Sequence, residues 1–379
     1  MTPAGTVLTA PGTPAPSHAP RPENPWPQGN PESRGHPDAL TAAERATCAA
    51  ILALLLPHRR TVDTDPPPDT PAAVLDSFPD QVRQLTPFVT AGQPVLFTLP
   101  GFPCKSPNPA KVLGHLPDEG ERLSLRFLDR LCARIATVYA PGARVLICSD
   151  GHLFGDLIHV PDAHIDAYSD GLRTMIRAEG LEHLDIFDLR TVYGDVPYDA
   201  KRARVHDTYA PTVDELRDRT RNDEQMLRLY RGITRFLVED TAEFEGTRSA
   251  LQRECRRRAY GVIQRSRAWG ALIADQRPRS FRLSIHPQPR RTDKFGIRLL
   301  DARDVWTTPW HSCVLHHSDG RWELMHRRKA EKVGRLVLRG GRPSHFEAEA
   351  ARIAAEAART EEAPEVAQAQ VARAEVAQA

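Results

Sequence analysis

Two short apolar runs, each ended abruptly by a loop, constrain the fold of this chain more than any other feature. Residues 94–99 lead into residues 99–111, where four prolines and a glycine exclude a regular helix and a central strand. Residues 145–148 stop at Ser149, Asp150 and Gly151. Between the runs, apolar residues recur at helical spacing, and residues 184–189 alternate like a further strand. This order of strand, loop and helix predicts a parallel sheet with helices packed on its faces.

The remaining segments predict a helical stretch and a second β-rich part. Thr41 and Glu44 form a capping box, which places the start of folded structure near Leu40. Residues 212–269 contain no proline and indicate helices, whereas residues 281–300 and 313–325 indicate strands, the latter a hairpin. The expected fold class is α/β, with a Rossmann-like parallel sheet core, helices on both faces and a smaller C-terminal β-containing region. The expected organisation is a disordered Pro-rich segment at 1–38, an α/β core at 39–270, a C-terminal α+β part of the same unit at 271–346, and a low-complexity Ala/Glu tail at 347–379.

Composition argues against several classes of protein. The 51 Lys and Arg nearly balance the 49 Asp and Glu, so no overall basic field attracts nucleic acid or a membrane surface. The most basic segment, 253–267, interleaves few aromatics, and we interpret it as a solvated helix face. No apolar run approaches the length of a membrane helix. The six cysteines show no CxxC spacing, which is typical of reduced thiols and predicts a cytoplasmic protein.

The loop at 99–111 is a candidate site for an anion or a polar substrate, because open parallel sheets bind ligands beyond the carboxyl ends of their strands. Lys105, Ser106 and Asn108 supply an ammonium, a hydroxyl and an amide beside backbone N–H groups. The prolines fix the loop in advance, so little ordering entropy is lost on binding. The alternative is that Lys105 is a surface lysine and that Asn108 caps a following helix, with Lys111 on the surface of that helix.

The second strand-end loop delivers Asp150 and His152 to the same edge of the sheet. Histidine titrates near neutrality, and a nearby carboxylate would orient its imidazole, so we expect these two residues to be catalytic acid–base groups, together with Lys105. The alternative is a structural Asx turn at Asp150 beside a His152 whose hydrogen bonds are satisfied.

A metal site is a further alternative for this segment. The His-x3-Asp spacing would place two ligands one helical turn apart, but Gly155 and Pro161 shorten the local helix. We therefore predict no metal here. The residues that such a site would use are His152, Asp156, His159 and His164.

A second constellation follows later in the chain. His286 ends one expected strand and His311 precedes another, so both are placed near the same crevice. Arg282 and Lys294 are candidates to neutralise a phosphate or a carboxylate. Trp310 either stacks on an aromatic substrate or belongs to the core. A Schiff base at Lys294 is chemically feasible but not favoured.

The pattern FPCKSPNPAKVLG at 102–114, followed by SDGHLFGDLI at 149–158, resembles the isocyanide (isonitrile) synthase family, which is grouped with the pyoverdine and dityrosine biosynthesis proteins. Residues 282–289, 294–297 and 308–312 agree with this resemblance, and residues 341–345 agree more weakly. The resemblance spans most of the chain, from Ala42 to His345.

The resemblance implies a function in secondary-metabolite biosynthesis. Members of the family convert the amino group of an amino acid, often tyrosine or tryptophan, into an isocyanide, with ribulose 5-phosphate as the one-carbon co-substrate and without a cofactor. A lyase-type reaction is implied, with phosphate held by Lys105 and Ser106. The expected partners are these small molecules and a pathway Fe(II)/2-oxoglutarate oxygenase that acts on the product, with neither nucleic acid nor membrane.

Three alternatives remain open at this point. One is an enzyme of the dityrosine type that forms an N-formyl amino acid. Another is a non-catalytic protein that binds a sugar phosphate or an amino acid. The third is a metal-dependent oxygenase that uses His152 and Asp156. The sequence names neither the amino acid accepted nor the oligomeric state.

Overall fold

The computed structural model describes residues 40–354, so the predictions for 1–38 and for most of 347–379 lie outside the described residues. The described chain begins with helix α1 (Ala42–Leu55). Thr41 caps it: the Thr41 Oγ1 accepts from the Glu44 N–H at 3.2 Å, and the Glu44 carboxylate accepts from the Thr41 N–H at 2.7 Å. The predicted capping box is confirmed.

A five-stranded parallel sheet, in the order β3-β2-β1-β4-β5, forms the centre of the molecule. After the central strand β1, the chain adds β2 and β3 on one side, and then returns to place β4 and β5 on the other side. The apolar runs of the sequence become β1 and β2, which pair from Val95 with Ala143 to Pro100 with Cys148. The strands are β1 (Val95–Pro100), β2 (Ala143–Cys148), β3 (Leu184–Phe187), β4 (Phe281–Ser284) and β5 (Phe295–Gly296).

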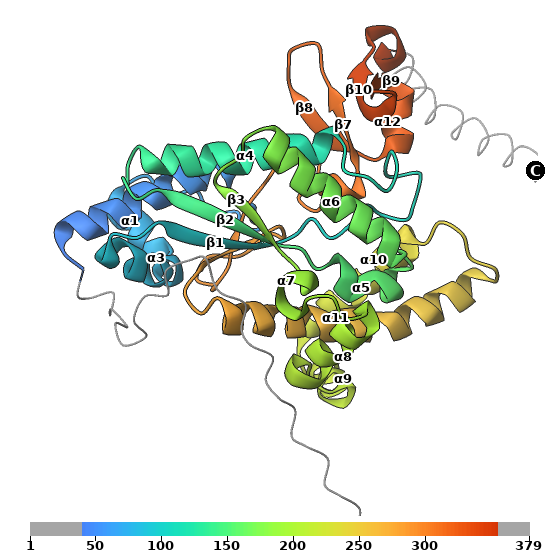
Figure 1. Cartoon of the computed structure of the whole chain (residues 1–379), viewed down its shortest axis with the longest axis horizontal. Coiled ribbons are helices and arrows are strands. Elements are labelled where there is room, and N and C mark those ends of the chain that lie inside the picture. Colours follow the sequence, from blue (N-terminus) through green and yellow to red (C-terminus); the bar gives the residue numbers. More distant parts are fainter. Residues whose placement is uncertain (1–39, 355–379) are drawn as a thin grey trace, which may run out of the picture.

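Helices cover both faces of this sheet (Figure 1). Alternate residues of β1 and β2, such as Phe97 and Ile147, pack in one core with α1, α3 and α4, whereas Leu146 and Cys148 pack against Trp269 and Leu272 of α11. The predicted α/β class with helices on both faces is thereby confirmed. The helices of this region are α2 (Pro71–Ser77), α3 (Pro79–Ala91), α4 (Glu119–Ala136), α5 (Gly151–Ile158), α6 (Asp162–Ala178), α7 (Leu189–Tyr193), α8 (Tyr198–Tyr209), α9 (Val213–Asn222), α10 (Glu224–Asp240) and α11 (Arg248–Gln276), with a short 3-10 turn η2 (Leu56–His58).

A second, mixed sheet in the order β6-β8-β7-β10-β9 lies beside the amino-terminal end of α4 (Figure 1). Its strands β7 and β8 form the predicted hairpin, and Gly320 in the turn has a φ of +84° that suits glycine. The elements of this part are β6 (Asp301–Ala302), a 3-10 turn η3 (Pro309–His311), β7 (Cys313–His316), β8 (Trp322–Met325), α12 (Arg327–Val333), β9 (Gly334–Arg339) and β10 (Arg342–Ala348).

Two segments differ from the sequence-based expectation. Residues 281–300 hold only the short strands β4 and β5, since Pro287 and Pro289 interrupt the ladder between them. These strands belong to the first sheet. The first sheet therefore takes strands from both sides of the expected boundary at residue 270, which itself lies in α11. The expected tail at 347–379 also begins inside β10, which runs to Ala348. Across residues 40–354, no helix combines the length and the apolarity needed to span a membrane.

Candidate active site

The strand order of the first sheet defines a crevice at the carboxyl ends of β1 and β4. All five strands run parallel, but the chain adds strands on one side of β1 first and then on the other, and open α/β sheets bind ligands at such a switch point. Asp150 follows the last residue of β2 by two positions, and His286 follows the last residue of β4 by two positions, so both leave the sheet at its carboxyl edge, on either side of β1.

Asp150 follows β2 directly and occupies the N-cap position of α5. Its side chain is partly buried, and burial raises the pKa of its carboxyl to about 7. Within residues 40–354, no other residue donates a hydrogen bond or forms an ion pair with this carboxyl. A carboxyl that titrates near pH 7 and has no structural partner is suited to general acid–base catalysis.

Two further titratable side chains come from the segments after β4: His286 follows this strand by two residues, and His311 ends η3. Both imidazoles remain accessible to solvent, yet surrounding protein desolvates them strongly enough to lower each pKa to about 4. We use the name recess for the part of the carboxyl edge of the sheet that carries Asp150, His286 and His311. The charges of Arg60, Lys294 and His311 add to the lowering of the pKa of His286. Both imidazoles are neutral at pH 7, so they can accept a proton or a hydrogen bond but do not supply positive charge.

Close packing fixes the loops that carry these groups. A Cβ on Gly101 would lie 3.1 Å from the Trp310 ring, and a Cβ on Gly151 would lie 2.0 Å from the carbonyl oxygen of Pro103. Phe102 adopts a φ of +54°, which is rare for a residue with a side chain, and its carbonyl accepts from the Ser149 hydroxyl at 2.9 Å. The loop after β1 is therefore held against both α5 and η3.

Arg60, from the amino-terminal part of the chain, ties two further loops together beside His286. Its guanidinium is 5% exposed and donates to the carbonyl of Ile285 and, at 2.9 Å, to the carbonyl of Thr307. Burial lowers the pKa of Arg60 to about 10. Arg60 thus holds the loop of His286 next to the loop that precedes η3.

Lys105 does not lie where the sequence-based prediction placed it. Its side chain is fully buried, and its Nζ lies 2.8 Å from carboxylate oxygens of both Asp118 and Glu121. The Nζ also donates to the Pro309 carbonyl at 3.0 Å. Although burial alone would lower the pKa of Lys105, the two carboxylates raise it. This geometry does not fit a contact between Lys105 and phosphate, and it does not fit the alternative of a surface lysine.

Ser106, Asn108 and Lys111 are likewise held by internal contacts. The Ser106 hydroxyl donates to Asp240 at 2.8 Å, and the Lys111 ammonium pairs with the same carboxylate at 2.7 Å. Asn108 donates to the Glu239 carbonyl and accepts from the Ala110 N–H, but no helix follows it. The prediction that Asn108 caps a helix is wrong, and so is the prediction that Lys111 lies on a helix surface. Prolines and the tertiary contact with α10 keep this loop irregular.

His152 points to a different set of partners from Asp150. It is buried and stacks on Tyr198 at 3.8 Å between ring centroids, with its Nε2 3.1 Å from the Asp166 carboxylate. The Tyr198 hydroxyl donates to the same carboxylate at 2.5 Å. Burial lowers the pKa of His152, although Asp166 acts in the opposite direction. The carboxylate beside His152 is therefore Asp166, and a direct Asp150–His152 pair is not formed.

The structure places the other residues of the second predicted constellation in different environments. Trp310 is 2% exposed and packs on Phe102 at 5.0 Å, which fits the alternative of a core residue. Arg282 is paired with Asp293. Lys294 is exposed, and its charge contributes to the lowered pKa of His286.

The metal alternative gains no support, since Asp156 is paired with Arg265 and the described residues contain no group of three potential ligands. The structure also reveals residues that sequence reasoning missed. Arg60 is one, and Trp306 is another: its indole is 60% exposed and lies 6.5 Å from the His286 ring. An isolated aromatic between Asp304 and Thr307 was the only signal that could have indicated Trp306.

A parallel sheet with a polar recess at its switch point has the architecture of an α/β enzyme. A family model described as "Pyoverdine/dityrosine biosynthesis protein" matches residues 85–337. The chain belongs to this family, and the resemblance seen in the sequence is confirmed.

Individual relatives agree with this assignment. The L-tyrosine isonitrile synthase of Pseudomonas aeruginosa is 49% identical over 287 residues, which cover 73% of this chain and 86% of that protein. The L-tryptophan isonitrile synthase AmbI2 of Fischerella ambigua is 39% identical over 301 residues, covering 78% and 90%. The crystal structure of the PvcA protein from Pseudomonas aeruginosa is similar with a TM-score of 0.72 at 45% identity, covering 79% of this chain and 99% of that one.

Proposed function

We propose that this protein is an isocyanide synthase that converts the α-amino group of an aromatic L-amino acid, tyrosine or tryptophan, into an isocyanide. The one-carbon donor in this proposal is ribulose 5-phosphate, and the reaction is of the lyase type in secondary-metabolite biosynthesis. The observation that carries the proposal is the unpaired Asp150 carboxyl, with its pKa near 7, in the recess of a chain 49% identical to an L-tyrosine isonitrile synthase.

The proposed chemistry begins when the amine adds to the ketone of ribulose 5-phosphate and water leaves to give an imine. Asp150 then removes protons from the carbon skeleton, which drives elimination of phosphate and a retro-aldol-type cleavage that leaves one carbon on nitrogen. Neutral His286 and His311 suit proton transfer along this path, because neither carries a charge at pH 7. Lys294 replaces the buried Lys105 as the proposed phosphate contact. We expect no metal or organic cofactor.

The test is incubation of the purified protein with ribulose 5-phosphate and each of the twenty amino acids in turn. The expected result is a mass increase corresponding to isocyanide formation with tyrosine or tryptophan, together with an infrared band in a window that formamides leave empty. Asp150→Asn should abolish the product, whereas Asp170→Asn, at an exposed position on α6, should not. No product with any amino acid would refute the proposal.

The runner-up is an enzyme that forms an N-formyl amino acid. It is favoured by similarity to the spore wall maturation protein DIT1 of Saccharomyces cerevisiae, which is 27% identical over 275 residues. A product with the mass of a formamide and no isocyanide band would select this alternative. Localisation in the cytoplasm and delivery of the product to an Fe(II)/2-oxoglutarate oxygenase remain predictions.

A further inference from the structure

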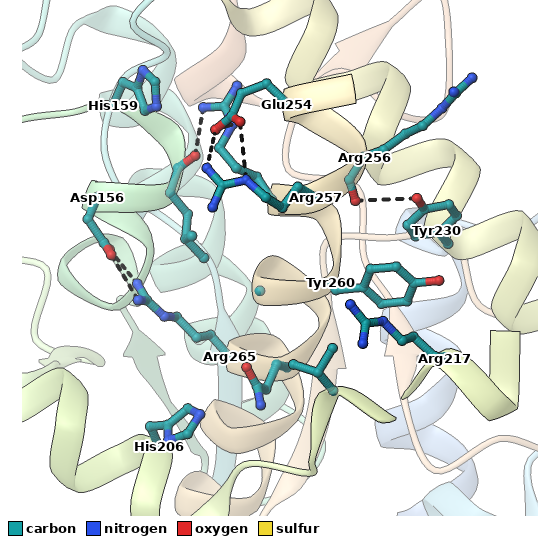
Figure 2. A pocket seen from close by; sticks show the side chains of 15 residues that line it. Asp156, His159, His206, Arg217, Tyr230, Glu254, Arg256, Arg257, Tyr260 and Arg265 are labelled. Carbon is teal, nitrogen blue, oxygen red and sulfur yellow. Dashed lines mark hydrogen bonds and ion pairs between the residues drawn. The ribbon is translucent and has the colours of Figure 1, made fainter. Parts of the chain in front are cut away.

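A groove of about 740 Å³ lies on the side of α11 that faces α5, α8, α9 and α10 (Figure 2). Neither Asp150, His286 nor His311 lines it, so it is separate from the recess at the carboxyl ends of the strands. Its volume lies within the range of small-molecule sites. One wall is formed by the basic segment 253–267, which was expected to be a solvated helix face. We call this feature the arginine groove, after the five arginines that line it: Arg217, Arg256, Arg257, Arg258 and Arg265. Two tyrosines, Tyr230 and Tyr260, line it as well.

The carboxylates of the groove already hold arginines. Asp156 accepts two hydrogen bonds from Arg265, one of them 2.8 Å long, and Glu254 accepts two from Arg257 at 2.7 and 3.2 Å. A third acid, Asp214, pairs with Arg217 at 3.0 Å. The five arginines that line the groove, Arg256 among them, still outnumber these three acids, so an excess of positive charge remains. This excess favours an anionic ligand.

Arg258 provides a second, independent indication. It is 7% exposed, and its Nη1 donates to the Leu157 carbonyl at 2.9 Å. Its Nε has no hydrogen-bond partner among the described residues, and the nearest carboxylate oxygen, on Glu254, is 3.8 Å away. A buried guanidinium with an unsatisfied N–H is costly, and a bound anion close to it would offset that cost.

One wall of the groove is aromatic. The rings of Tyr230 and Tyr260 lie 4.6 Å apart, and the guanidinium of Arg217 lies 5.9 Å from the centroid of the Tyr260 ring. Figure 2 shows Arg217 and Tyr260 lying next to each other at one end, with His159 and Glu254 at the other. Guanidinium planes and phenol rings stack on flat heterocycles, whereas guanidinium forks bind phosphate.

We propose that the arginine groove binds a nucleotide, with the base against Tyr260 and Arg217 and the phosphates near Arg257 and Arg258. The site is distinct from the proposed substrate recess and does not depend on the proposed reaction. His159, at the phosphate end, is desolvated and has a lowered pKa, to which Arg258 also contributes. A bound phosphate would reverse this effect, so the His159 ring reports on occupancy.

The experiment is calorimetric titration of the full chain with ADP, adenosine and inorganic phosphate, without the proposed substrates. ADP should bind more tightly than adenosine or phosphate, because only ADP engages both ends of the groove. Arg217→Ala should weaken ADP binding about tenfold. The matched control is Arg221→Ala on the same helix α9, which removes the same charge and the same kind of ion pair, to Asp218, from a side chain that does not line the groove, and it should leave the affinity unchanged.

Further readouts make the result decisive. ADP should raise the pKa of His159 in an NMR titration, and ribulose 5-phosphate should not displace ADP. Absence of ADP binding at millimolar concentration would overturn the proposal. Equal losses in Arg217→Ala and Arg221→Ala would indicate non-specific attraction and would also overturn it, as would displacement by ribulose 5-phosphate. Because these measurements need no turnover, they stand whether or not isocyanide formation is observed.

Discussion

The titratable residues of the recess differ in their pKa values. The pKa of Asp150 is raised to about 7, whereas the pKa values of His286 and His311 are lowered to about 4. Only Asp150 therefore changes its charge within the range in which enzymes normally work. This carboxyl is the natural choice for a base that must be charged while the neighbouring imidazoles stay neutral.

A pH profile tests this role. Asp150 is protonated below about pH 7, so kcat/KM of the wild type should rise through pH 7 as the base ionises. Asp150→Asn should lower kcat by about 10²–10⁴-fold and remove that rise. A profile in which the rise persists in the Asn variant would rule out Asp150 as the titrating base.

Stability provides an independent control for the same variant. The raised pKa means that the native state holds the Asp150 proton more tightly than the unfolded chain does, so this group costs stability as the pH rises from about 4 to 7. Asp150→Asn removes this cost, and its melting temperature should gain relative to the wild type at pH 8 but not at pH 4.

Trp306 is the second residue with a direct prediction. Its indole is exposed beside His286, and two backbone N–H bonds to Asp304 hold its loop. Stacking on an aromatic substrate would bury this ring. Trp306→Ala should raise KM for the amino acid about tenfold and leave KM for ribulose 5-phosphate unchanged, with Trp306→Phe close to wild type. Equal changes in both KM values would contradict a specific contact.

At the scale of elements, Lys105 joins three parts of the site. It comes from the loop after β1, pairs with Asp118 and Glu121 at the start of α4, and donates to the Pro309 carbonyl in η3. Burial raises the pKa of Asp118, and Glu121 acts in the same direction, while Lys105 opposes both. The ammonium therefore holds η3, and with it His311, at the end of α4.

Removing this ammonium should be costly. Lys105→Met leaves two carboxylates without their partner in the interior, and breaking a buried pair in this way costs about 3–5 kcal/mol. Denaturant unfolding should show this loss, whereas Lys329→Met, at an exposed lysine of α12, should change the free energy of unfolding by less than about 0.5 kcal/mol. Similar stability of the two variants would show that the buried network contributes little.

At the scale of the whole molecule, direct contacts hold the second sheet and α12 against the elements around the first sheet. The backbone N–H groups of Arg327 and Arg328 donate to the carbonyls of Lys111 and Ala110, which joins the loop after β1 to the start of α12. Arg339 of β9 pairs with Glu119 of α4 at 2.9 Å. The second sheet is therefore packed onto the elements that form the recess.

This arrangement predicts cooperative unfolding. Thermal transitions followed by far-UV circular dichroism and by tryptophan fluorescence should coincide, because Trp310 and Trp269 lie in the two cores of the first sheet and Trp322 lies on the second sheet. Two separated transitions would show that the second sheet unfolds independently.

Local patterns allowed several features to be predicted. The capping box at Thr41, the helical spacing of α4 and the short apolar strands arise from contacts between near neighbours in the sequence. The position of Asp150 could also be predicted, because a residue directly after a parallel strand must lie at the carboxyl edge of the sheet.

The sequence by itself determined the α/β class and the edge of the sheet at which Asp150 lies, because strand periodicity and loop composition are local properties. Only the tertiary structure decided which polar groups remain available there. Lys105 pairs with Asp118 and Glu121, which follow it by 13 and 16 residues. Lys111 pairs with Asp240 of α10, so neither lysine is available to a ligand. Which side chains are buried, and which partners they find, depends on contacts between residues that are distant along the chain. Such contacts enclose Lys105 but leave Asp150 and His286 accessible.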